Sequence, residues 1–375
     1  IGKGGAGTKA FIGVYDGHGY TLEDYKNTDF PNERFIGLFG QLGEMSVDDS
    51  KTATVSNEKP GIIRNVVMLA TDPEEQSGLI VATYNPSPTS NIGDTSVGTL
   101  VGLIYTPNSA VENCVVSGYT VDYTNQVSVS FDIYSHLGGL VGINMGTVKN
   151  CSVISSTLTA RATRSNIKTY VSGLVGANFG TIEGCYAGGE LSIDPSTPGT
   201  RVINGLAGFS GGTWGNRPYH SYGVKVTRNS YSICRIQASN ATVYPVSPTS
   251  CVYGGITYTQ TVSNSYYLTN TVSATVASSG SGGTGLAYEI MDGTQLSGGQ
   301  TFTQMLNAGI SAGNRNFGNA TAVHTYPYSG KLTARPYPFP AIVRNTVVDQ
   351  GITTSFYVHY GDWPLLTDYS ISITG

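Results

Sequence analysis

Charged residues are scarce in this sequence. Asp, Glu, Lys and Arg together make up 12% of the 375 residues, about half the usual share. The formal net charge is −4, and Lys and Arg form no run, which excludes the basic footprint of a nucleic-acid-binding protein. No stretch of about 18 apolar residues occurs, so we expect no membrane-spanning helix in this segment.

Motifs for metal ions and catalysis are also missing. The five cysteines form no C-x-x-C pair, and none of the five histidines begins an H-E-x-x-H motif, so we expect no metal and no cofactor. Carboxylates do not recur in a repeated column. Asp122 and Asp132 are the nearest candidates for a catalytic pair, but we expect no catalytic residues. A disulfide between Cys234 and Cys251 and two free thiols both remain open.

Glycine and tyrosine are abundant, with 49 and 25 residues, which suits short strands joined by frequent turns. The sequence also repeats itself. The stretch GGLVGINMGTVKNCSV at Gly138–Val153 recurs from Ser172 as SGLVGANFGTIEGCY and from Gly98 as GTLVGLIYTPNSAVENCV. Degenerate copies begin at Gly37, Gly205 and Gly254. Six copies of a unit of this length indicate a solenoid.

Each copy contains a predicted bend. Val148 and Cys151 are three positions apart, so one straight strand cannot bury both side chains. Asn and Gly tolerate the left-handed backbone region that a sharp corner requires. We therefore predict structural corners at the aligned Asn or Gly of the six copies, namely Asn65, Asn113, Asn150, Gly184, Asn229 and Asn264.

The two columns beside this corner differ in chemistry. The following column holds mostly small residues, which are predicted to stack beneath the corner: Val66, Cys114, Cys151, Cys185, Ser230 and Ser265. The preceding column alternates in charge from copy to copy, with Arg64, Glu112, Lys149, Glu183 and Arg228. If the coils stack as neighbouring strands, opposite charges face one another across about 4.8 Å.

These residues resemble the GLUG motif of bacterial surface proteins. Phe11–Leu22, followed by FIGLFG at Phe35, resembles the segment that often precedes such repeats. The resemblance covers roughly residues 11–340. It implies a β-solenoid and an extracellular role at the bacterial cell surface, and it supplies no catalytic residues.

The predicted fold is all-β, a right-handed parallel β-solenoid (β-helix) with irregular loops and a small C-terminal cap. We assign residues 1–290 to the solenoid, and residues 291–375 to the capping region and a strand-like tail. A short helix is predicted at Thr301–Ala308 and ends at Gly309. The tail, Leu365–Thr374, alternates apolar and polar residues and could add to the sheet edge of a neighbouring copy or remain a local strand.

One loop stands out as a candidate ligand-binding site. Ser210–Tyr222 interrupts the fifth copy and concentrates aromatic, amide and basic side chains, which suit sugar stacking and hydrogen bonding. The candidate residues are Trp214, Asn216, Arg217, Tyr219, His220 and Tyr222. Packing of the loop onto itself is the alternative.

We expect a secreted, non-catalytic adhesin or ligand-binding structural module at the bacterial cell surface. Its partners would be surface glycans, host or matrix proteins, or other copies of itself. A subunit of an extracellular filament or pilus-like assembly is one alternative. A β-helix polysaccharide lyase or hydrolase is the other, and it would require carboxylates about 5–10 Å apart.

Overall fold

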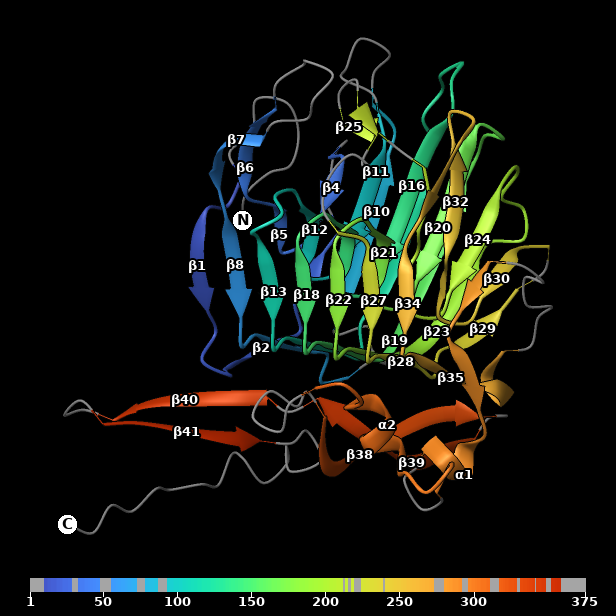
Figure 1. Cartoon of the computed structure of the whole chain (residues 1–375). Coiled ribbons are helices and arrows are strands. Elements are labelled where there is room, and N and C mark those ends of the chain that lie inside the picture. The colour runs from blue at the N-terminus through green and yellow to red at the C-terminus, as the bar shows by residue number, and fades with distance from the viewer. Residues whose placement is uncertain are drawn as a thin grey trace.

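The structure is a computed structural model, and it confirms an all-β parallel solenoid. The described residues are 10–28, 33–47, 55–72, 78–86, 93–211, 213–214, 217–218, 224–238, 240–272, 280–291, 296–310, 317–328, 331–340, 342–348 and 352–358. The central coils contribute strands to four sheets, here called A to D, and within these sheets each strand pairs in parallel with its equivalent on the next coil (Figure 1).

One coil is best followed in the central copy. β16 (Ile133–Gly138) belongs to sheet A, β17 (Val141–Asn144) to sheet B, β18 (Thr147–Lys149) to sheet C and β19 (Ser152–Ala162) to sheet D. The next coil begins with β20 (Ile167–Ser172), which lies beside β16 in the register Ile133↔Ile167. The repeated sequence unit is therefore one turn of the solenoid.

The remaining strands of the four sheets follow the same order. Sheet A also contains β4 (Phe35–Ile36), β11 (Thr95–Gly98), β24 (Arg201–Asn204) and β30 (Thr242–Tyr244). Sheet B also contains β5 (Phe39–Leu42), β12 (Val101–Ile104) and β21 (Val175–Asn178). Sheet C also contains β1 (Gly13–Asp16), β8 (Gly61–Arg64), β13 (Ala110–Glu112), β22 (Thr181–Glu183), β27 (Val226–Arg228) and β34 (Thr261–Ser263).

Sheet D is the largest sheet in the described part of the chain. Its main path contains β2 (Thr21–Glu23), β9 (Val67–Leu69), β14 (Val115–Ser117), β23 (Tyr186–Ile193), β28 (Tyr231–Ser232), β35 (Tyr266–Leu268) and β37 (Thr284–Leu286) beside β19. Four further strands lengthen it: β3 (Lys26–Asn27), β10 (Leu79–Tyr84), β15 (Thr120–Asn125) and β29 (Arg235–Gln237). The leading segment thus supplies a first coil of its own, because β1 and β2 pair with β8 and β9.

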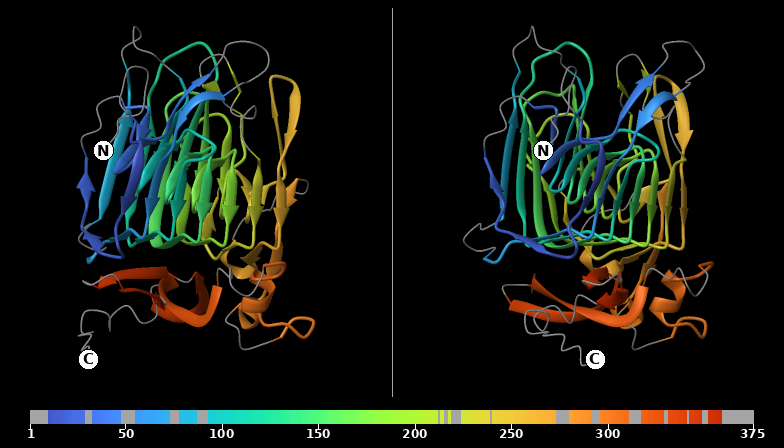
Figure 2. Two further views of the ribbon diagram at one scale, coloured as in Figure 1. Left: turned by 60° about the vertical axis from the view of Figure 1, so that its left-hand side comes forward. Right: turned by 90° about the vertical axis from the view of Figure 1, so that its left-hand side faces the viewer.

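The coil forms two arms on a common base (Figure 2). In one arm sheet A packs against the long strands of sheet D, and the hydroxyl of Tyr123 donates a hydrogen bond to Thr95 Oγ1 at 2.5 Å. Sheets B and C form the other arm. A continuous core of Val, Ile, Leu and Ala side chains fills the coil, and the three stacked residues Val97, Leu137 and Val171 are fully buried.

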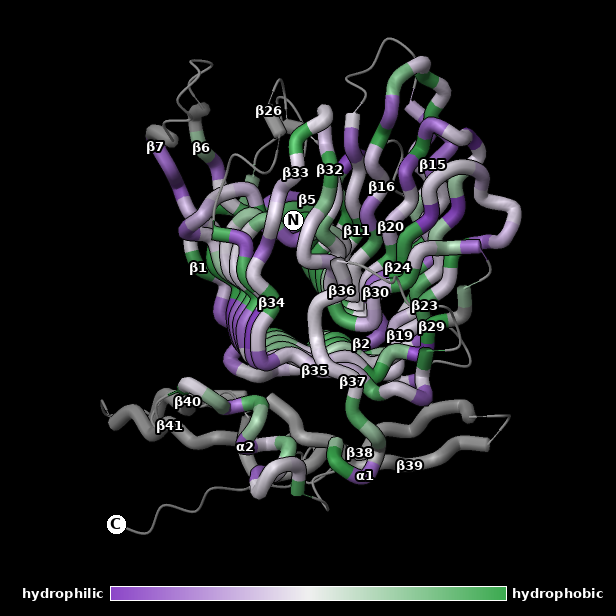
Figure 3. Tube along the Cα trace, turned by 45° about the vertical axis from the view of Figure 1, so that its right-hand side comes forward, coloured by the Kyte–Doolittle hydropathy of each residue, from purple (hydrophilic) through white to green (hydrophobic). Residues whose placement is uncertain are grey.

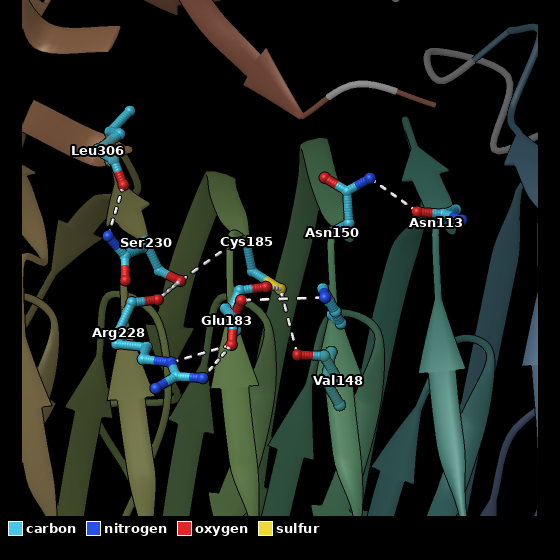
Figure 4. A network of polar contacts seen from close by, with 10 residues as sticks. Asn113, Val148, Asn150, Glu183, Cys185, Arg228, Ser230 and Leu306 are labelled. Carbon is cyan, nitrogen blue, oxygen red and sulfur yellow. Dashed lines mark hydrogen bonds and ion pairs between the residues drawn. The ribbon is translucent and has the colours of Figure 1, made fainter. Parts of the chain in front are cut away.

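All six aligned corner residues have positive φ. The values are 56° at Asn65, 52° at Asn113, 56° at Asn150, 65° at Gly184, 50° at Asn229 and 45° at Asn264. The Asn side chains also form a ladder between coils (Figure 4). Asn150 donates from Nδ2 to Asn113 Oδ1 at 2.7 Å, and Asn113 donates to Asn65 Oδ1 at 3.3 Å. The positive φ and the ladder together explain why Asn recurs here.

The side chains of the neighbouring Cys and Ser column accept hydrogen bonds from backbone amides at the corner. The amide of Cys114 donates to Cys151 Sγ at 3.4 Å, that of Cys151 to Cys185 Sγ at 3.5 Å, and that of Cys185 to Ser230 Oγ at 3.0 Å. Each thiol or hydroxyl in turn donates to the carbonyl two residues before it, as Cys185 does to Glu183 at 3.3 Å. A small side chain that both accepts and donates therefore occupies five of the six copies, whereas Val66 stands at this position in the first. All five cysteines, including Cys234 and Cys251, are free thiols.

The charge column lies along sheet C as a hydrophilic stripe (Figure 3). Arg228 Nε donates to Glu183 Oε2 at 2.9 Å, and Lys149 Nζ lies 3.9 Å from Glu183 Oε1. Arg64 pairs with Asp16 of the first coil at 2.8 Å. The basic side chains are 41–50% exposed and the carboxylates 13–14%. Each partly exposed pair contributes modestly to the free energy of unfolding, and together the pairs favour the correct register.

The junction of sheets A and B requires the glycines of the repeat. A Cβ on Gly142 would lie 2.5 Å from the carbonyl oxygen of Gly102, and one on Gly176 would lie 2.5 Å from that of Gly142. The amides of Leu140 and Val141 both donate to the carbonyl of Leu174 on the next coil, at 2.9 and 3.1 Å. The backbone thus turns so sharply that no side chain fits on its outer side.

Insertions between strands form antiparallel hairpins. They are β6 (Glu44–Val47) with β7 (Val55–Lys59), β25 (Thr213–Trp214) with β26 (Arg217–Pro218), and β32 (Ser250–Tyr253) with β33 (Ile256–Thr259). In addition, β31 (Ser247–Pro248) pairs antiparallel with β36 (Ser281–Gly282), which is distant in the sequence. Near the C-terminus, β38 (Phe317–Tyr328) pairs with β39 (Lys331–Pro340), and β40 (Ile342–Val348) with β41 (Ile352–Val358). No helix in the described residues is long and apolar enough to cross a membrane.

Two short helices, α1 (Tyr288–Met291) and α2 (Phe302–Leu306), follow the solenoid. The predicted helix at Thr301–Ala308 is confirmed as α2, with a capping box between Thr301 and Gln304. Phe302 lies edge-on to Tyr231 and Tyr266 of sheet D. These segments and the C-terminal hairpins lie beside sheet D (Figure 1). The expectation that residues 291–375 form a cap stays a prediction, and the tail from Leu365 lies outside the described residues.

Candidate functional site on the outer face of sheet A

The predicted ligand loop is described only in part. Trp214 in β25 and Arg217 in β26 lie opposite each other in a two-residue antiparallel pair. Asn216, Tyr219, His220 and Tyr222 lie outside the described residues. The role of these six residues in ligand binding therefore stays a prediction.

The base of that loop, by contrast, is well defined. Ser210 Oγ lies 2.7 Å from His136 Nε2, and both residues are buried. A Cβ on Gly211 would lie 2.4 Å from the ring of Tyr253 and 2.6 Å from the hydroxyl of Tyr134. The loop thus starts directly on a group of aromatic side chains that the sequence did not single out.

This group, here called the aromatic face, consists of Tyr134, His136, Tyr170 and Tyr253. The ring planes of Tyr134 and His136 differ by 12°, those of Tyr134 and Tyr170 by 22°, and those of His136 and Tyr170 by 30°, with centroids 5.4–6.4 Å apart. Tyr253 is turned by 66° relative to Tyr134, at 5.7 Å. His136 is fully buried, so the accessible floor consists of the similarly oriented, partly exposed rings of Tyr134 and Tyr170, and Tyr253 stands against Tyr134 as a wall.

Strand alternation explains how the floor arises. In β16, Ile133, Ser135 and Leu137 point into the coil and are buried, so Tyr134 and His136 point outwards. The parallel register places Tyr170 of β20 beside His136, and Lys168 beside Tyr134. Tyr253 comes from the hairpin β32–β33, which is inserted into a later coil.

The aromatic face has almost no net charge. Burial lowers the pKa of His136 to about 3, so its imidazole is neutral at physiological pH. Burial raises the pKa of Tyr134 to about 12 and also raises that of Tyr170, so both phenols keep their protons. Burial likewise raises the pKa of the nearby Cys251 thiol to about 12. The site therefore has neutral groups that can donate and accept hydrogen bonds.

Polar and apolar groups border this face. Lys168 Nζ lies 3.3 Å from Asp132 Oδ2, and the two side chains are 26% and 55% exposed. The backbone amide of Tyr134 donates to Asp94 Oδ1 at 2.9 Å. At the tip of the β32–β33 hairpin, Val252 and Ile256 are exposed. The border thus combines one ion pair with apolar surface.

The candidate catalytic carboxylates lie on different sheets. Asp122 is in β15 of sheet D, whereas Asp132 immediately precedes β16 of sheet A and is paired with Lys168. Within the described residues, no group of three or more His, Cys, Asp or Glu side chains could hold a metal ion. The expectation that the protein is not an enzyme stays a prediction.

Sequence reasoning missed the aromatic face for a structural reason. Its members come from two successive coils and one inserted hairpin, so they form no local motif. The one available signal was the outward alternation of Tyr134 and His136 beside Lys168 and Tyr170, which becomes visible only after the coils are aligned.

Stacked four-strand coils with glycine turns and Asn corners define a parallel β-solenoid of the repeat class. Residues 133–159 match the family model described as the GLUG motif, and this range covers β16, β17, β18 and most of β19. The chain therefore contains a GLUG motif in its central coil. No curated protein and no solved structure matches the chain.

Proposed function

We propose that this protein is a secreted bacterial surface module that binds other molecules without transforming them, as an adhesin does. The observation that carries the proposal is a nearly uncharged aromatic face held on a rigid solenoid. The GLUG motif supports an extracellular setting.

The architecture suits recognition more than chemistry. Parallel coils with a continuous core hold the side chains of sheet A in fixed positions, so little conformational entropy is lost on binding. Since the aromatic face relies on rings and neutral hydrogen-bonding groups, its binding should depend weakly on salt.

A binding panel tests this proposal. Purified protein is applied to immobilised glycans and extracellular matrix proteins at about 0.05 and 0.5 M salt. The proposal expects saturable binding to at least one target, with similar affinity at both salt concentrations. Absence of binding to every target, or binding that disappears at high salt, would contradict it.

A filament subunit is the second candidate, and the first coil favours it. Tyr15 and Leu22 continue the core columns of Ile63 and Met68, yet they are 42% and 39% exposed. Tyr20 in the same coil is 80% exposed. An uncovered coil offers both apolar surface and strand edges to another copy.

Deletion of Leu365–Gly375 separates two routes to such an assembly. If the intact protein self-associates and the truncated protein does not, the tail carries assembly. If both associate equally, the exposed coil is the better candidate. A monomer at high concentration in light scattering removes the filament proposal.

A further inference from the structure

We propose that the aromatic face binds a neutral pyranose unit of a surface glycan, with the sugar stacked on Tyr134 and bordered by Tyr253. This inference rests on the proposed binding function and adds the site and the chemical class of the ligand.

The ring geometry fits a flat, partly apolar ligand. Tyr134, Tyr170 and Tyr253 are each partly exposed, whereas Tyr84, Tyr123, Tyr186 and Tyr231 are fully buried. The planes of the two floor rings, Tyr134 and Tyr170, differ by 22°, and Tyr253 stands at 66° to Tyr134. A pyranose presents a C–H-rich face to such a floor, and its edge would meet the wall.

Polar groups lie where sugar hydroxyls would reach them. Lys168 is opposite Tyr134 in the register of sheet A, and its ammonium is held by Asp132 at 3.3 Å. This pair offers both donors and acceptors beside an aromatic ring. The phenol hydroxyls add neutral donors and acceptors, because they keep their protons.

Charge disfavours anionic ligands. His136 is neutral, and Lys168 is already paired with Asp132. Phosphate-rich or uronate-rich chains would therefore find no unpaired cationic cluster among these groups, whereas neutral sugars need none.

The experiment measures binding of soluble polysaccharides by affinity electrophoresis and calorimetry. Dextran, mannan, laminarin and xylan serve as neutral probes, and polygalacturonate and heparin as anionic ones. Tyr134→Ala is expected to weaken binding of the recognised neutral glycan by about tenfold. Lys168→Met and Asp132→Asn, which change partly exposed side chains, are expected to weaken it by about threefold or more.

Tyr267→Ala is the matched control, because Tyr267 is a partly exposed tyrosine in β35 of sheet D and not of sheet A. The affinity of this control variant for the recognised neutral glycan should stay within about twofold of that of the wild type. If Tyr134→Ala fails to fold by circular dichroism, Lys168→Met and Asp132→Asn decide the question.

The outcomes separate this inference from the proposed function. Binding of a neutral glycan that is insensitive to the sheet A variants overturns the site and leaves the function standing. Binding only to anionic chains, or only to matrix proteins, overturns the sugar assignment. Failure to bind any probe or matrix protein contradicts both.

Discussion

At the scale of single residues, the corner between sheets C and D depends on Asn and Gly in the left-handed backbone region. Five Asn residues and Gly184 share φ values of 45–65°. Where Gly184 replaces Asn, the amide ladder is interrupted, and Asn229 on the following coil donates instead to the carbonyl of Leu306 at 2.6 Å. Backbone conformation is thus common to all six corners, whereas the side-chain ladder is not.

Replacing Asn150 by Val should lower the free energy of unfolding by about 1–3 kcal/mol, because a β-branched residue is strained at a φ of 56°. Asn150→Gly is the control, since it removes the ladder bond and keeps the backbone relaxed. In urea denaturation, we expect Asn150→Gly to lose less free energy of unfolding than Asn150→Val. Equal losses would show that the hydrogen bond, and not the backbone, determines this position.

His136 should make stability depend on pH. Its pKa is about 3 in the folded protein, against an ordinary value of 6.5, so between these values the unfolded chain binds a proton that the folded chain does not. Stability from this group therefore rises with pH across the window, by about 1.4 kcal/mol per pH unit. Below pH 3 and above pH 6.5 the contribution is flat.

The check compares wild type with His136→Asn by urea denaturation at pH 4.5 and 6. Wild type should lose about 2 kcal/mol more than the variant on acidification. Identical losses in the two proteins would mean that the imidazole is protonated in the folded state.

At the scale of elements, α2 is attached to the stack by both side-chain packing and hydrogen bonds. Phe302 and Leu306 are fully buried, and Phe302 is edge-on to two tyrosines of successive coils at 5.1 and 5.5 Å. Two corner residues, Asn229 and Asn264, donate to the carbonyl of Ala308 at 3.0 and 3.3 Å. The segment that follows α2 therefore connects the last two Asn corners.

Phe302→Ala should release α2 from sheet D, because it removes a buried ring from the small cluster beneath the helix. Hydrogen exchange is expected to speed up by at least about tenfold for amides of α2 while those of β18 and β22 stay protected. Met305→Ala, at a partly buried position of the same helix, should have a smaller effect. Equal loss of protection throughout would contradict local attachment.

Much of the fold could be predicted from the local chemistry of the repeated residues. Asn at positive φ, small Cys and Ser residues, and alternating charges all act between adjacent coils at fixed positions, so aligned copies reveal them. The two arms could not be foreseen, because the reason for glycine at position 142 is the close approach of the backbone of the neighbouring coil, which the sequence does not show. The same holds for the aromatic face, whose members Tyr134 and Tyr253 are far apart in sequence and meet only through an inserted hairpin.

At the scale of the whole molecule, the solenoid divides its roles among its faces. Sheet C carries paired charges, sheet D carries the apolar column onto which α2 packs, and sheet A carries the aromatic face. The first coil exposes the end of the core. A rigid body with one uncharged aromatic face is consistent with holding a ligand in place.

The central claim is that the protein binds glycans without cleaving them. Its most direct test incubates the purified protein with the neutral polysaccharides and, in the same samples, measures bound glycan, new reducing ends and absorbance from unsaturated sugars. The account predicts retained glycan and no products above the protein-free blank. Product release that is abolished by Asp122→Ala or Asp132→Ala would contradict it and establish a lyase or hydrolase instead.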